Sequence, residues 1–145
     1  MPNPHPFLTH FPIALLAVGF FFDLIGRYRA QGELSRYGWW NQLLGTAGLA
    51  ATIVSGLLAE GTTVIGPEAR RAFEAHEQIA FAAAVLFTLL LFWRIASRTA
   101  VPPKNGWVFL LLYGAGIIIL CAGALYGGEM VYHLGVGVSG VRGPG

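Results

Sequence analysis

The chain has 145 residues, of which 55% are hydrophobic and 11% are charged, and its mean hydropathy is +0.62. A water-soluble domain carries about 25% charged residues, so this chain has too little polar surface for a soluble globule. The formal charge of +2 comes with no basic stripe, which argues against nucleic acid as a partner, and the single cysteine excludes an internal disulfide.

Four apolar runs are each long enough to cross a bilayer of roughly 30 Å, which takes about 20 residues of helix. We expect spans at about residues 8–27, 40–60, 74–96 and 107–133. The predicted fold is therefore an all-α membrane protein, an up-and-down bundle of four transmembrane helices that forms a single domain over residues 1–145.

The first span opens at a proline and contains an acid. Pro12 suits the first turn of a helix, where its missing N–H costs nothing, and Thr9 is a candidate cap just before it. Asp23 lies one turn before Arg27, a spacing that allows the two side chains to pair.

The second span is rich in Gly, Ala and Ser, which let helix backbones approach closely in lipid. We therefore expect it to pack against other helices rather than to face acyl chains on all sides. Gly66-Pro67-Glu68 is typical of a helix start, with Pro in the first position and an acid in the first turn. Pro102 to Gly106 is a clear break before the fourth span.

The distribution of Lys and Arg predicts the orientation, because cytoplasmic loops collect these residues. The connectors after the first and third spans hold six of them, against three on the opposite side, so we expect both termini in the periplasm. The six are Arg27, Arg29, Arg36, Arg94, Arg98 and Lys104, and the three are Arg70, Arg71 and Arg142.

All four histidines fall at the ends of predicted spans. His5 and His10 precede the first span, His76 opens the third and His133 closes the fourth. In an up-and-down bundle these ends share one side of the membrane, so the imidazoles converge near the outer interface. A single histidine at a helix end is more often an interfacial hydrogen-bonding residue than a ligand.

Carboxylates accompany the histidines at this depth. Glu129 and His133 are one turn apart on a helix, and Glu77 is a second candidate supporting acid. A carboxylate that accepts one imidazole N–H leaves the other nitrogen free for a metal. Arg70 and Arg71 are candidate partners of haem propionates, although a solvated turn is the simpler interpretation.

Haem and zinc are the two centres that such histidines favour. Zinc in a closed site takes four compact ligands. Haem slides between apolar helices, and two axial histidines leave its iron no open position, which favours electron transfer. Small residues in the second and fourth spans would give the ring room, although ordinary close helix packing explains them equally. Covalent c-type haem is excluded, because no Cys-x-x-Cys-His is present.

Three parts of the chain carry a resemblance to a known family. They are the head motif His5-Pro6-x-x-x-His10-Phe11-Pro12-Ile13-Ala14, a histidine that opens the third helix, and the tail Gly127-Gly128-Glu129-Met130-Val131-Tyr132 with Gly135-Val136-Gly137-Val138. The chain resembles the bacterial four-helix membrane family catalogued as domain of unknown function twenty-two thirty-one. The resemblance implies a small four-helix membrane domain, found alone or within respiratory and cytochrome-containing proteins. We expect the protein in the bacterial inner membrane. One departure is that the family tail often places histidine directly before Gly-Val-Gly-Val, where this chain has Leu134.

We therefore expect a membrane b-type cytochrome, an electron-transfer subunit rather than an enzyme on its own. It would bind one or two haem b groups near the periplasmic face through His5, His10, His76 and His133. His10 and His76 are the preferred iron ligands, because each lies nearest the apolar zone. The expected partners are membrane lipid, a redox partner protein or a larger respiratory-type complex, and quinone.

Two alternatives use the same sequence differently. A divalent-metal binder or transporter would employ the histidines with Glu77 and Glu129, but it should need polar groups deeper in the membrane, and residues 79–93 offer none that can bind a metal. A membrane anchor subunit would need none of the histidines.

Overall fold

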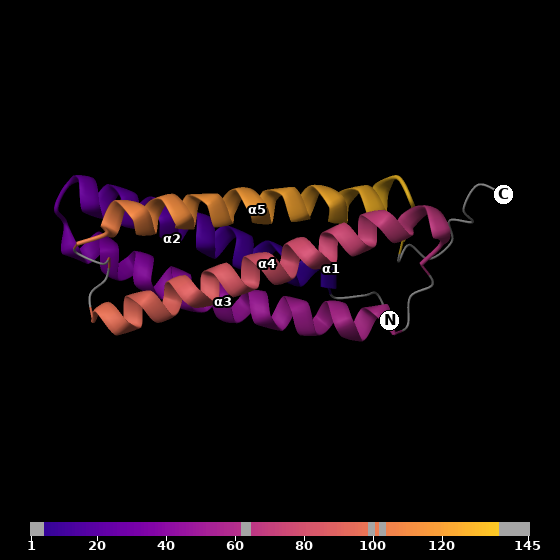
Figure 1. Ribbon diagram of the computed structural model, residues 1–145, viewed down its shortest axis with the longest axis horizontal. Coiled ribbons are helices and arrows are strands. Elements are labelled where there is room, and N and C mark those ends of the chain that lie inside the picture. Colours follow the sequence, from indigo (N-terminus) through magenta and orange to yellow (C-terminus); the bar gives the residue numbers. More distant parts are fainter. Residues whose placement is uncertain (1–4, 62–64, 99–100, 102–103, 137–145) are drawn as a thin grey trace.

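In the computed structural model, which describes residues 5–61, 65–98, 101 and 104–136, the chain forms one short helix and four long ones (Figure 1). They are α1 (His5–Leu8), α2 (His10–Tyr28), α3 (Gly32–Glu60), α4 (Pro67–Ser97) and α5 (Gly106–Tyr132). The described residues contain no strand. The four long helices are each long and apolar enough to cross a membrane, which confirms the predicted all-α four-helix membrane bundle.

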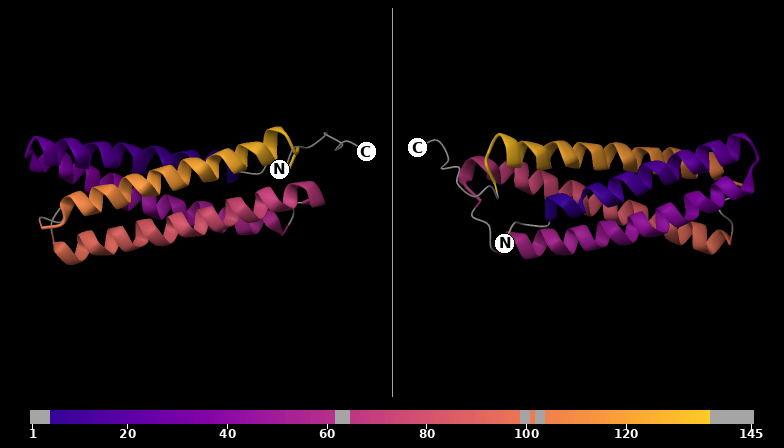
Figure 2. Two further views of the ribbon diagram at one scale, coloured as in Figure 1. Left: turned by 45° about the horizontal axis from the view of Figure 1, so that its top comes forward. Right: turned by 180° about the vertical axis from the view of Figure 1, so that it is seen from behind.

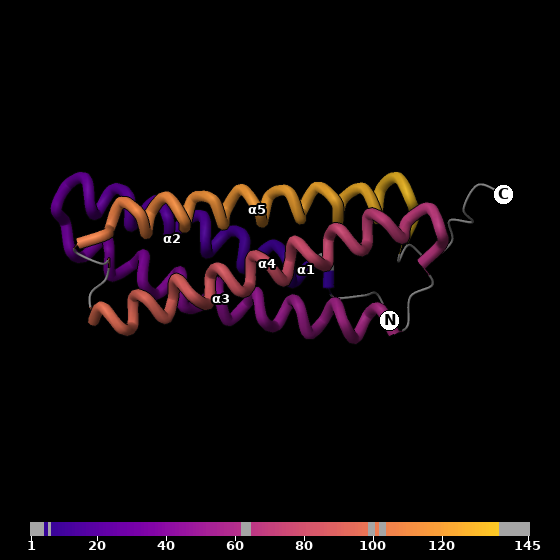
Figure 3. The backbone as a smooth tube through the Cα atoms, in the orientation of Figure 1, coloured from indigo at the N-terminus to yellow at the C-terminus, as the bar shows by residue number. Residues whose placement is uncertain are grey.

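The helices run up and down and pair as two hairpins. α2 packs along α3, and α4 packs along α5, more extensively than either hairpin packs on the other (Figure 2). Figure 3 shows α3, α4 and α5 extending along nearly the whole bundle, with α2 shorter and preceded by α1. We call the end where α2 and α4 finish the connector end, and the end where they begin the histidine end.

Two of the observed helices begin well before the apolar runs that predicted them. α3 begins at Gly32 and α4 at Pro67, earlier than residues 40 and 74, because hydropathy marks the membrane crossing and not the end of a helix. The predicted start at Gly66-Pro67-Glu68 is confirmed. Thr9 does occupy the cap position of α2, but its side chain makes no capping hydrogen bond. The predicted tail after Val136 lies outside the described residues.

Glycines bring α2 and α3 into close contact. A Cβ on Gly45 would lie 2.7 Å from Cγ of Leu16, and one on Gly19 would lie 3.0 Å from Cβ of Asn41. A contact of 2.7 Å is shorter than real Cβ atoms show, and one of 3.0 Å is tighter than most of them, so a larger residue at either position would force its neighbours to shift. The expectation that small residues of the second span allow close helix packing is confirmed at these contacts.

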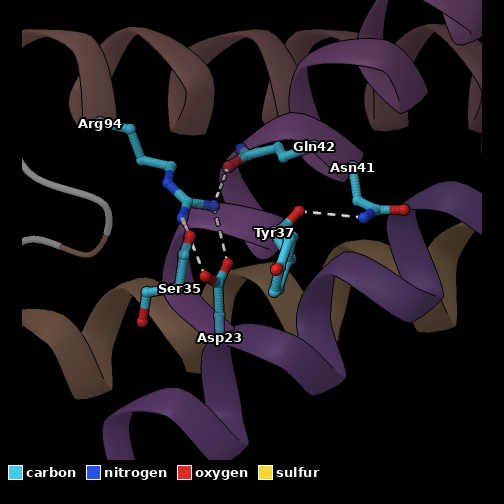
Figure 4. A network of polar contacts seen from close by, with 6 residues as sticks. All are labelled: Asp23, Ser35, Tyr37, Asn41, Gln42 and Arg94. Atoms are coloured by element: carbon cyan, nitrogen blue, oxygen red, sulfur yellow. Dashed lines mark hydrogen bonds and ion pairs between the residues drawn. The ribbon is translucent and has the colours of Figure 1, made fainter. Parts of the chain in front are cut away.

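A buried ion pair joins the two hairpins near the connector end (Figure 4). Nη1 and Nη2 of Arg94 donate to the two carboxylate oxygens of Asp23 at 2.7 and 2.8 Å. Nη1 also donates to Oε1 of Gln42 at 2.7 Å, and Nη2 to the carbonyl oxygen of Ser35 at 3.2 Å. Asp23 is 0% exposed and Arg94 is 1% exposed, so one guanidinium links α4 to α2 and α3 inside the bundle.

The predicted pairing of Asp23 with Arg27 is therefore wrong. Asp23 faces the bundle interior, where a carboxylate requires an equally buried cation, and Arg94 supplies it. The guanidinium of Arg27 instead lies over the ring of Trp107, with its central carbon 5.3 Å from the ring centroid. Arg94 is thus a core residue at the end of α4, and the predicted orientation of the bundle stays a prediction.

We expect Arg94→Met to destabilise the protein by about 3–5 kcal/mol, because it leaves the Asp23 carboxylate buried without a counter-ion. Asp23→Asn should have a comparable effect through the unpaired guanidinium. The double variant removes both charges and should recover much of the loss. Unfolding of the purified protein in mixed micelles measures the four free energies, and additive losses in the double variant would contradict the pairing.

Candidate histidine site

Two imidazoles from distant parts of the chain meet at the histidine end. The ring centroids of His5, in α1, and His76, in α4, are 6.3 Å apart, and their planes are nearly perpendicular at 88°. Both side chains are partly buried. The site therefore draws one residue from the segment before the first hairpin and one from the second hairpin.

Backbone carbonyls orient both rings. Nδ1 of His5 lies 3.1 Å from the carbonyl oxygen of Thr52 and 3.0 Å from Oγ of Ser55. Nδ1 of His76 lies 2.8 Å from the carbonyl oxygen of Gly123. Because a carbonyl can accept but not donate, Nδ1 carries the proton in each neutral ring, and Nε2 keeps its lone pair. This is the tautomer that a histidine ligand of a metal adopts.

Pro12 explains how His5 reaches α3. Proline has no N–H, so the carbonyl of Leu8, four residues earlier, receives no helical hydrogen bond from position 12. The hydroxyl of Thr52 lies 3.3 Å from that carbonyl oxygen and 2.9 Å from the carbonyl oxygen of Gly48, so its single proton is shared between the two acceptors. The same Thr52 accepts from His5, so the interrupted helix and the ring are fixed on one residue of α3.

A glycine lies against each ring. A Cβ on Gly56 would come within 2.9 Å of Cε1 of His5, and a Cβ on Gly127 would lie 3.3 Å from Cε1 of His76. Elsewhere the small residues serve helix packing, since Gly116 faces Phe87. Ordinary close packing of helices is thus confirmed at Gly116, and room for a haem ring stays a prediction.

Protein covers the histidine end less completely than the connector end. In α3 no described residue after Thr52 is fully buried, and the same is true of α4 between Ala72 and Ala83 and of α5 between Gly123 and Met130. Those segments surround the two imidazoles. Side chains at this level thus stay accessible to a non-protein group or to lipid.

Burial lowers the pKa of His5, which precedes the first spanning helix, below its ordinary value of 6.5. The neighbouring His76 lowers the pKa further, and the hydrogen bond with Thr52 opposes the shift. His5 therefore favours its neutral form, which is the form of imidazole that binds metal.

The other two predicted ligands are exposed. His10 is exposed in the first turn of α2, and His133 is exposed just after α5. The structure thus places His5, not the preferred His10, beside His76. Among the residues described, no group of three or more His, Cys, Asp or Glu side chains could hold a metal ion.

The charged residues expected to support the site lie at exposed or partly exposed positions. Arg70 pairs with Glu74 at 3.1 Å on the exposed face of α4, and Arg71 is exposed. Glu129 is exposed and Glu77 is partly exposed. At Nδ1 of both rings, backbone carbonyls take the role that the sequence suggested for carboxylates.

The sequence reasoning missed the polar network of Asp23, Gln42 and Arg94. A signal was present, because Asp23 interrupts Phe20-Phe21-Phe22 and Leu24-Ile25, and Arg94 follows an equally apolar run. An ionisable residue inside a transmembrane helix calls for a partner in the bundle. In an up-and-down arrangement Asp23 and Arg94 both lie near the connector end, so each was a candidate partner for the other.

Comparison with known proteins supports the membrane assignment. A family model described as "Predicted membrane protein (DUF2231)" matches residues 2–140, nearly the whole chain. No curated protein and no solved structure matches the chain. The family description states no activity, so the function has to be argued from the site.

We expect the free energy of unfolding to fall as the pH drops below about 6.5. Folded His5 binds a proton more weakly than unfolded His5, so the unfolded state takes up more protons in this range. The loss should end once folded His5 is also protonated. Unfolding measured against pH should show a shallower acid loss in His5→Gln, and identical profiles for the two proteins would contradict the shift.

Proposed function

Because the chain belongs to the DUF2231 family of membrane proteins, whose description leaves the activity open, we propose a function from its histidine site. The protein is a membrane b-type cytochrome in which His5 and His76 are the axial ligands of one haem near the periplasmic face. It passes electrons between a donor in the membrane or periplasm and a partner protein, as a subunit of a larger redox complex.

The separation of the two rings carries this proposal. Imidazole nitrogens bind metals at about 2.0–2.1 Å, so two rings on opposite sides of one ion have centres about 6.4 Å apart, against about 5.2 Å in a tetrahedral site. The centroids of His5 and His76 are 6.3 Å apart. The spacing is consistent with ligands on opposite sides of one ion, as on haem iron, and is wider than a compact zinc site requires.

The surroundings of the rings also fit haem. Both rings present the Nε2 lone pair, because Nδ1 of each is hydrogen-bonded to a carbonyl oxygen. The adjoining segments of α3, α4 and α5 are incompletely covered by protein. A haem held by two histidines supplies electron transfer without an open iron position.

One haem is proposed, because the described residues contain one pair of imidazoles this close. A divalent-metal carrier receives less support, since the described residues offer no third His, Cys, Asp or Glu at the pair. Membrane lipid surrounds the bundle in this proposal, and quinone is a candidate electron donor or acceptor.

Visible absorption spectra test the proposal. Protein purified from cells that make haem should show a Soret band and, after reduction with dithionite, the sharp bands of a six-coordinate b-type haem. His5→Ala and His76→Ala should lose these bands, because each removes one axial ligand.

His10→Ala and His133→Ala are the matched controls, since both residues are exposed at the same end of the bundle. They should keep the wild-type spectrum. Loss of haem in His10→Ala with retention in His5→Ala would overturn the ligand assignment. Wild-type protein that binds a divalent metal but no haem would support the carrier instead, and protein that binds neither would support an anchor subunit.

Gly56→Ala tests the position of the His5 ring without removing a ligand. The added Cβ would lie 2.9 Å from Cε1 of His5, so the ring must move, whereas at Gly48 the nearest atom is an ordinary 3.6 Å away. A forced rotamer costs about 0.5–1.5 kcal/mol, which corresponds to haem affinity weakened by a few-fold to about tenfold. Haem titration should show this loss in Gly56→Ala and not in Gly48→Ala, and equal affinities would argue against His5 as a ligand.

A further inference from the structure

Four polar atoms in the bundle core have no hydrogen-bond partner among the described residues. They are Nε2 of Gln42, Oγ1 of Thr46, Nε of Arg94 and the hydroxyl oxygen of Tyr113. Their residues are at most 9% exposed. In a membrane lipid chains cannot satisfy such atoms, and an unpaired buried polar atom is costly.

The four residues belong to one region of the core. Gln42 and Thr46 are one turn apart on the buried face of α3, and Gln42 accepts a hydrogen bond from Arg94 at 2.7 Å. The hydroxyl of Tyr113 reaches across from α5 to the α2–α3 contact. A Cβ on Gly19 would be 2.8 Å from that hydroxyl and 3.3 Å from the carbonyl oxygen of Gly38, one turn before Gln42.

From these contacts we propose that this region is a binding site for water, with one or more molecules held between Gln42, Thr46 and Tyr113 beside the Asp23–Arg94 pair. The site is independent of the histidine site and of the function proposed for it.

The chemistry of the four atoms selects water as the ligand. Nε2 of Gln42 and Nε of Arg94 can donate but not accept, whereas the hydroxyls of Thr46 and Tyr113 can do both. Asp23 and Arg94 already neutralise each other, so the region calls for a neutral ligand and not an ion. Water accepts and donates at once, and buried waters typically make about three hydrogen bonds to such groups.

The sign of a stability change tests the site. If water binds Tyr113, Tyr113→Phe and Thr46→Val each remove a satisfied hydrogen bond and should lower the thermal unfolding midpoint by about 3–6 °C. If the hydroxyls have no partner, the same changes remove an unpaired polar atom, and the midpoint should stay the same or rise.

The matched controls are Tyr132→Phe and Thr88→Val, which change the same groups at exposed positions of α5 and α4. They should leave the midpoint unchanged in the same detergent micelles. A structure at a resolution that shows ordered water should contain density within hydrogen-bond distance of the Tyr113 hydroxyl and Nε2 of Gln42. An unchanged or raised midpoint in Tyr113→Phe, or a dry region in that structure, would overturn the proposal.

Discussion

The ion pair between Asp23 and Arg94 is the constraint on which the arrangement of the helices depends. A lone charge inside a membrane span is expensive, and these two side chains are almost completely buried. The cost is met by a bidentate pairing, two further oxygen acceptors, and the rings of Trp39 and Phe109 within 5.7 and 5.3 Å of the guanidinium carbon. Gly38 leaves the space that the Asp23 carboxylate occupies. The pair thus fixes how the two hairpins meet.

The two ends of the bundle consequently differ in character. Near the connector end and in the middle, Leu16, Phe87, Leu90, Phe109 and Tyr113 form a closed core beside the ion pair. At the histidine end the long helices carry few fully buried residues, and the hairpins are bridged by His5 and His76. The closed half thus sets the positions of the helices, and the less covered half carries the two imidazoles on which the haem proposal rests.

Hydropathy and helix-start patterns were enough to predict the fold, because four long apolar runs in a chain of 145 residues leave few other arrangements. The same patterns placed the histidines at one end. They could not identify which rings meet, since that depends on the direction of side chains around helices whose relative rotation the sequence does not state. Asp23 was matched to Arg27 by spacing, whereas burial decides for Arg94. Spacing along the sequence does not show which side chains are buried, and burial determines the partner of Asp23.

The choice of His5 over His10 shows how a local backbone rule determines a site. Residues five apart on a continuous helix point about 140° from each other, so the two histidines of the head motif could not both face inward. The missing N–H of Pro12 leaves the Leu8 carbonyl for Thr52, and Thr52 in turn accepts from His5. The helix is interrupted at Thr9, and α1 lies against α3. The proline that begins the first span therefore acts on the site through the turn before it, because the Leu8 carbonyl that it leaves open contacts the same residue, Thr52, that orients the His5 ring.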